Sequence, residues 1–119
     1  MLTLLLLAAC APDVVTFTQV QNDIFTNSCA FSSCHSDGGG AQGLTLAEGS
    51  AYDAIVGVPS TLSMTLNLIE PGDHENSFLW QKCADVEGIV GEPMPQDSPI
   101  DADRLAALAA WIDNGALND

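Results

Sequence analysis

Basic residues are nearly missing from this chain of 119 residues. Lys82 and Arg104 are the only Lys and Arg, against 16 Asp and Glu, so the formal net charge is −14 at pH 7. Such a surface repels phosphate backbones, which excludes nucleic-acid binding. It favours encounters with proteins that present a basic docking surface, although an acidic surface that only keeps a protein in solution has the same charge.

The chain also lacks a hydrophobic run long enough to cross a bilayer. The apolar run at residues 4–9 is too short, but it is typical of a signal peptide, although no Lys or Arg precedes it. Leu7-Ala8-Ala9-Cys10 is similar to a bacterial lipobox, in which cleavage precedes a lipidated cysteine. We therefore expect residues 1–9 to be a lipoprotein signal peptide, with a lipid anchor at Cys10 and a tether at residues 10–16. A buried N-terminal helix is the alternative.

Internal repeats and a second hydrophobic block are missing as well, so residues 17–117 are expected to form one domain. Apolar periodicity and capping residues predict short helices at about residues 18–27, 50–56 and 75–82, and a longer helix between Asp101 and Asn114. Leu44-Thr45-Leu46 alternates too briefly to predict a sheet. The fold class is therefore mostly α, with long loops that need a large apolar ligand to wrap.

A cysteine pair followed by a histidine comes directly after the first predicted helix. Cys29 and Cys34 offer two thiols for thioether bonds to the vinyl groups of a haem, and His35 offers an imidazole as proximal iron ligand. The common attachment motif has two residues between its cysteines, whereas this segment has four, so the second thiol needs a more bulged loop. The motif predicts one covalently attached haem c.

Further motifs follow the Cys-x4-Cys-His segment, and together with it they resemble those of small secreted bacterial c-type cytochromes over about residues 17–116. They are Gly43-Leu44-Thr45-Leu46, Ala51-Tyr52, Pro71-Gly72-Asp73 with Asn76-Ser77, Gly91-x-x-Met94-Pro95 and Trp111-Ile112-Asp113-Asn114-Gly115-Ala116. The resemblance implies a cytochrome c-like fold in which the first and last helices cross and loops close a haem cleft. It also implies electron transfer with redox protein partners, in the periplasm or cell envelope.

The resemblance implies that the sixth iron ligand comes from a loop shortly before the last helix, where Met94 stands between Pro93 and Pro95. Met64 and His74 are weaker candidates, because Met64 lies in an apolar segment and His74 in a polar turn. Leu44, Leu46 and Trp111 are expected to line the cleft. With both axial positions filled and no catalytic arrangement of side chains evident, we do not expect an enzyme.

Cys83 is left over if Cys10 is lipidated and Cys29 and Cys34 hold the haem. A disulfide between Cys29 and Cys83, with the haem held by Cys34 and His35, is one alternative. A structural zinc site made by Cys29, Cys34, Cys83 and either His35 or His74 is another, although adjacent ligands are hard to aim at one tetrahedral ion. A third is a disulfide-stapled acidic surface lipoprotein that acts as a binding module without a cofactor.

Overall fold

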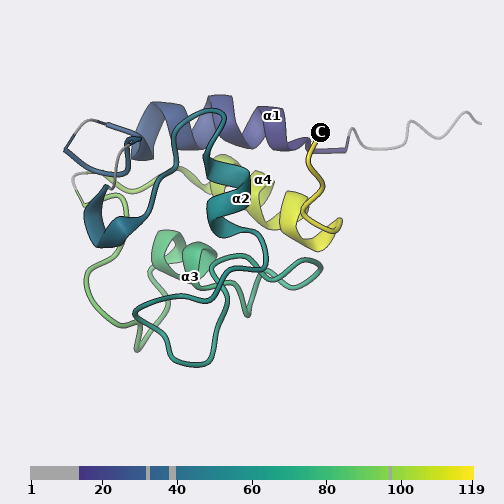
Figure 1. Cartoon of the computed structure of the whole chain (residues 1–119). Helices are drawn as coiled ribbons and strands as arrows, with labels where there is room; N and C mark the ends of the chain where they lie inside the picture. Colours follow the sequence, from purple (N-terminus) through teal and green to yellow (C-terminus); the bar gives the residue numbers. More distant parts are fainter. Residues whose placement is uncertain (1–13, 32, 38–39, 97) are drawn as a thin grey trace, which may run out of the picture.

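The computed structural model describes residues 14–31, 33–37, 40–96 and 98–119. The predicted signal peptide, the lipidation site Cys10 and the first part of the tether lie outside these residues. The elements in order are α1 (Phe17–Val20), η1 (Gln21–Cys29), η2 (Ala41–Gly43), α2 (Ala51–Ile55), α3 (Phe78–Ala84) and α4 (Ala102–Asp113) (Figure 1). The described ranges contain isolated β-bridges but no strand, so the fold is mostly α. No helix in them is long and apolar enough to cross a membrane.

The helix α1 continues directly into η1, and together they deliver Cys29 to the site. Thr16 and Gln19 begin this helix with a capping box, in which Gln19 N donates to Thr16 Oγ1 (3.1 Å) and Thr16 N donates to Gln19 Oε1 (2.9 Å). The second half has the wider π-helical turn, and Ala30 N donates to Phe25 O at 2.8 Å. The helix thus extends beyond the predicted range 18–27 and ends at Cys29.

Three aromatic rings join the first helix to α2 and to the last helix. The ring centroid of Phe17 lies 5.2 Å from that of Tyr52 on α2 and 5.4 Å from that of Trp111 on α4. The two polar ring groups bond to the C-terminal segment, with Tyr52 Oη donating to Ala116 O (2.7 Å) and Trp111 Nε1 donating to Leu117 O (2.9 Å). Figure 1 accordingly shows the end of the chain next to α1. We call Phe17, Tyr52 and Trp111 the aromatic cluster.

Residues flanking the predicted domain range also make contacts with the domain. Val15 packs against the core, and Thr16 caps the first helix. At the other end of the chain, Asp119 O accepts a hydrogen bond from Thr18 N at 3.1 Å, and Asp119 Oδ1 accepts one from Phe17 N at 2.9 Å. Residues before and after the predicted range 17–117 therefore also make contacts with the domain.

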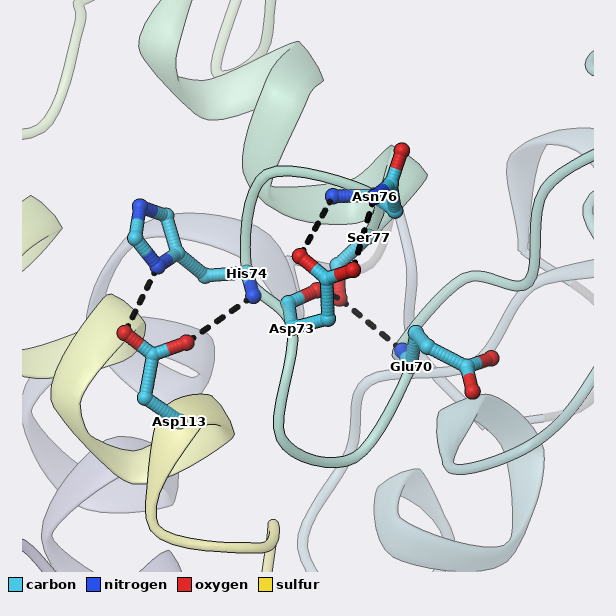
Figure 2. Close-up of polar contacts among 6 residues, drawn as sticks. All are labelled: Glu70, Asp73, His74, Asn76, Ser77 and Asp113. Atoms are coloured by element: carbon cyan, nitrogen blue, oxygen red, sulfur yellow. Dashed lines mark hydrogen bonds and ion pairs between the residues drawn. The ribbon is translucent and has the colours of Figure 1, made fainter.

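The helix α3 begins later than the sequence predicted, because a hydrogen-bonded turn precedes it. Ser77 Oγ donates to Asp73 O (2.9 Å) and accepts from Glu70 N (2.9 Å), while Asp73 Oδ2 accepts from Asn76 Nδ2 at 2.7 Å (Figure 2). Asp73 therefore stabilises a turn, and α3 begins at Phe78 and not at about residue 75 as the sequence predicted. Phe78 and Leu79, at the start of α3, are buried.

The same turn is fixed to the end of α4 by His74. His74 N donates to Asp113 Oδ1 at 3.0 Å, and His74 Nδ1 lies 2.7 Å from Asp113 Oδ2 (Figure 2). The other end of α4 is capped as predicted, since Asp101 Oδ1 accepts a hydrogen bond from Arg104 N at 2.8 Å. The helix α4 therefore contacts both the first helix and the segment around α3.

Candidate functional site

One cavity of about 610 Å³ brings together the residues that the sequence singled out. Cys29, Cys34, His35 and Met94 all line it, although Met94 comes from a distant loop. Apolar side chains from the helices and loops complete the lining, among them those of Phe31, Leu46, Leu79 and Ile100. A mostly apolar cavity of roughly 300–1,000 Å³ with a few polar groups is typical of a cofactor or ligand site.

Two backbone segments hold His35 in place. His35 N donates to Cys29 O (3.1 Å), and Leu46 N donates to His35 O (2.8 Å), so the residue is bonded on both sides. The ring nitrogen Nδ1 lies 3.1 Å from Leu44 O. Because a carbonyl oxygen only accepts, Nδ1 carries the proton in this bond and Nε2 keeps its lone pair in the neutral ring. His35 therefore has the tautomer that a metal-binding imidazole needs.

Two residues that the sequence did not single out support this arrangement. Gln21 is 4% exposed, and its Nε2 donates to Leu46 O at 2.9 Å, which ties the segment beside His35 to the first helix. Gly40 passes so close to the backbone that an added Cβ would lie 2.6 Å from both His35 Cα and Leu44 O. Nothing in the sequence indicated that the close approach of the backbone occurs at Gly40.

The structure separates Met94 from the other candidates for an axial ligand. Met94 is half-buried in the cavity lining, and its backbone N donates to Lys82 O at 3.0 Å. Met64 has a 96% exposed side chain. His74 is bonded to Asp113, and its ring packs edge-on against Trp80 with the centroids 4.6 Å apart. Neither Met64 nor His74 lines the cavity.

The expected lining of the cleft is correct for only one of three residues. Leu46 lines the cavity, whereas Trp111 belongs to the aromatic cluster and is 1% exposed there. Leu44 contributes its carbonyl oxygen to His35, and its side chain packs against the core. Apolar character alone predicted burial, but it did not distinguish the cavity wall from the core.

Three cysteines lie around the same cavity as free thiols, namely Cys29, Cys34 and Cys83. Burial and, as a smaller contribution, the nearby Cys34 together raise the pKa of Cys29 to about 12. The pKa of Cys83 is also raised to about 12, mainly by burial and in part by Cys29, against an opposing effect of Lys82. Cys29 and Cys83 are both free thiols in the structure, and the alternative disulfide between them stays a prediction.

The structure lends no support to the alternative zinc site. In the part of the chain that the structure describes, no three or more His, Cys, Asp and Glu side chains are grouped so that they could hold a metal ion. His74, one of the two histidines considered for this site, is bonded to Asp113 and does not line the cavity. The cavity is instead lined by the thiols of Cys29, Cys34 and Cys83, together with His35 and Met94.

Gly40→Ala should destabilise the loop that holds His35. The added methyl group would meet backbone atoms, which cannot move aside as a flexible side chain can, so we expect a loss of about 1–3 kcal/mol in the free energy of unfolding. Gly49→Ala is the control, because it meets nothing within 4 Å and costs only about 1 kcal/mol for its positive φ. Urea unfolding measures both, and equal losses would contradict the tight approach at Gly40.

The buried thiols should make the reduced chain less stable at alkaline pH. Cys29 and Cys83 keep their protons to about pH 12 in the folded chain, whereas unfolded thiols ionise near 9.0. Their contribution to stability is therefore fully present below pH 9.0 and is lost as the pH rises towards 12. Urea unfolding between neutral and alkaline pH measures this loss, and Cys83→Ala should make it smaller. An unchanged pH dependence in that variant would contradict the role of Cys83.

No family model, curated protein or solved structure matches this chain. Its function therefore has to be argued from its own residues. The strongest observation is that one cavity collects two motif cysteines, the adjacent histidine and a methionine from a separate loop.

Proposed function

We propose that the chain is a single-haem electron-transfer protein with a covalently attached haem c in this cavity. The observation that carries the proposal is the convergence of Cys29, Cys34, His35 and Met94 on one largely apolar cavity. Each residue fits its role, because both thiols are free, the imidazole directs only Nδ1 to the backbone, and Met94 offers a neutral thioether. When bound, the haem would supply a one-electron ferrous–ferric couple.

His35 and Met94 are the two residues that would bind the haem iron. The bond to Leu44 O orients the His35 ring and increases the basicity of Nε2. Met94 stands in a loop whose backbone is bonded to α3 through Lys82 O, and a thioether ligand raises the reduction potential. Both ligands thus come from segments fixed by backbone hydrogen bonds, which keeps them in place when the charge of the site changes.

Electron transfer is favoured over catalysis because the chain itself supplies both axial ligands. No coordination position then remains open for a substrate. The net charge of −14 favours encounter with a redox partner that has a basic docking surface, and this attraction should weaken at high salt. We further propose a lipid anchor at Cys10 and a periplasmic or cell-envelope location, where covalent haem attachment and stable disulfides are both feasible.

A cytochrome c-like architecture is part of the same proposal. The first helix packs against the last helix and ends at Cys29, and two loops contribute residues to the cavity lining, among them His35 and Ala41 from one loop and Met94 and Ile100 from the other. These features agree with a fold in which loops close over a flat apolar ligand, and the ligand would bury the apolar wall of the cavity.

The proposal is tested by expressing the full chain together with a bacterial system that attaches haem to cysteines. We expect a red protein that keeps one haem after denaturation and acid extraction, as measured by intact mass and absorption spectroscopy. Cys34→Ala should keep at most the thioether of Cys29, Cys29→Ala at most that of Cys34, and the variant that lacks both cysteines should lose the covalent haem. A colourless wild-type chain that is folded by circular dichroism would overturn the proposal.

Replacement of Met94 tests the sixth ligand. Met94→Ala should leave the haem attached but lower its reduction potential, on the order of 100 mV within the roughly 0.8 V range that axial ligands set. Met64→Ala is the matched control, because this methionine is 96% exposed and does not line the cavity. Redox titration measures both variants, and equal potentials for Met94→Ala and wild type would exclude Met94 as the ligand.

A further inference from the structure

Lys82 is a buried cation in a chain that has only two basic residues. Its side chain is 7% exposed, which is unusual for lysine because burying an ammonium group is costly unless it is paired or hydrogen-bonded. Nζ donates to Val90 O at 2.9 Å and lies 5.9 Å from the ring centroid of Phe78. A backbone carbonyl and an aromatic face therefore offset part of the cost of burial.

The bond from Lys82 reaches the loop that carries Met94. Val90 O accepts from Nζ, and a Cβ added to Gly91 would lie only 3.1 Å from Nζ, so the loop passes closely over the ammonium group. Gly91 has a φ of +78°, a conformation that glycine adopts without strain. Met94 N donates to the backbone carbonyl of Lys82 at 3.0 Å. Lys82 thus holds the loop at two points, with its side chain at Val90 and with its backbone carbonyl at Met94.

The helix that carries Lys82 is itself well anchored. Leu79 and Cys83 on α3 belong to the buried core and line the cavity. Lys82 also lies near enough to Cys83 to oppose the rise in its pKa. The positive charge of Lys82 is therefore buried beside the cavity wall, where it is screened less than an exposed charge.

We propose that Lys82 is a positioning residue for Met94 and that its buried charge raises the reduction potential of the site. This inference rests on the proposed haem function. Lys82 acts on the iron site through the loop, by fixing Val90 and Met94 to α3. Its charge acts in addition, because a nearby cation disfavours the oxidised form, which has one more positive charge than the reduced form.

The loop contact is tested on the full chain without haem, so its outcome does not depend on the proposed function. Amide hydrogen exchange should show Met94 N–H protected in the wild type. Lys82→Met keeps the length of the side chain and removes the bond to Val90, so the Met94 amide should exchange roughly tenfold faster. Gln81→Met is the matched control, because Gln81 Nε2 donates to Glu75 O instead, at 2.7 Å.

Two results would overturn the positioning role. One is a Met94 amide in the wild type that exchanges as fast as in an unstructured peptide. The other is equal exchange rates in wild type and Lys82→Met. The first measurement needs no variant, so it remains decisive even if Lys82→Met fails to fold.

The role of the charge is tested by redox titration of the haem-loaded chain. Lys82→Met should shift the reduction potential downwards, whereas Lys82→Arg, which keeps the charge, should restore much of it and Gln81→Met should leave it unchanged. The charge-transfer band of methionine-ligated ferric haem should weaken in Lys82→Met. An unchanged potential in Lys82→Met with haem attached would overturn the charge effect. A chain that binds no haem would instead overturn the proposed function and leave the exchange result valid.

Discussion

The packing of the first helix against the last through Phe17 and Trp111 is the contact on which the rest of the structure depends. The aromatic cluster lies where the first helix begins and α4 ends, and the ring centroids of Phe17 and Trp111 are 5.4 Å apart there. At the opposite ends of the same helices, Cys29 and Arg104 line the cavity. One end of the helix pair is therefore closed by the chain's own side chains, while the other end leaves space for a ligand.

Hydrogen bonds help to hold the loops around this space. His35 is bonded to Cys29, Leu44 and Leu46, and Met94 is bonded to Lys82. Fixing a loop residue costs about 1–2 kcal/mol of backbone entropy, and these bonds offset part of that cost before any ligand binds. The proposed ligand side chains are thus positioned in advance, which reduces the ordering that binding would otherwise require.

The charges of the chain are distributed unevenly around the same site. Of the two basic residues, Arg104 lines the cavity and Lys82 is buried beneath the loop of Met94, while 16 acidic residues determine the overall field. Arg104 Nε lies 3.7 Å from Asp101 Oδ2, an exposed pair that contributes little to stability. Both basic residues therefore lie beside the proposed redox site, although the net charge of the whole chain is strongly negative.

The sequence alone was sufficient to predict those elements that depend on interactions between residues one or two helical turns apart. Asp101 and the apolar stripe after it correctly predicted α4, and Cys34 and His35, which their adjacency singled out, both line the cavity. Tertiary structure alone decided that α3 begins at Phe78, that Trp111 packs in the aromatic cluster, that Leu44 orients His35 and that Lys82 holds the loop of Met94. The reason is physical: caps and periodicity depend on near neighbours in the chain, whereas the partner of a carbonyl, an indole ring or a buried ammonium group depends on segments that meet only after folding.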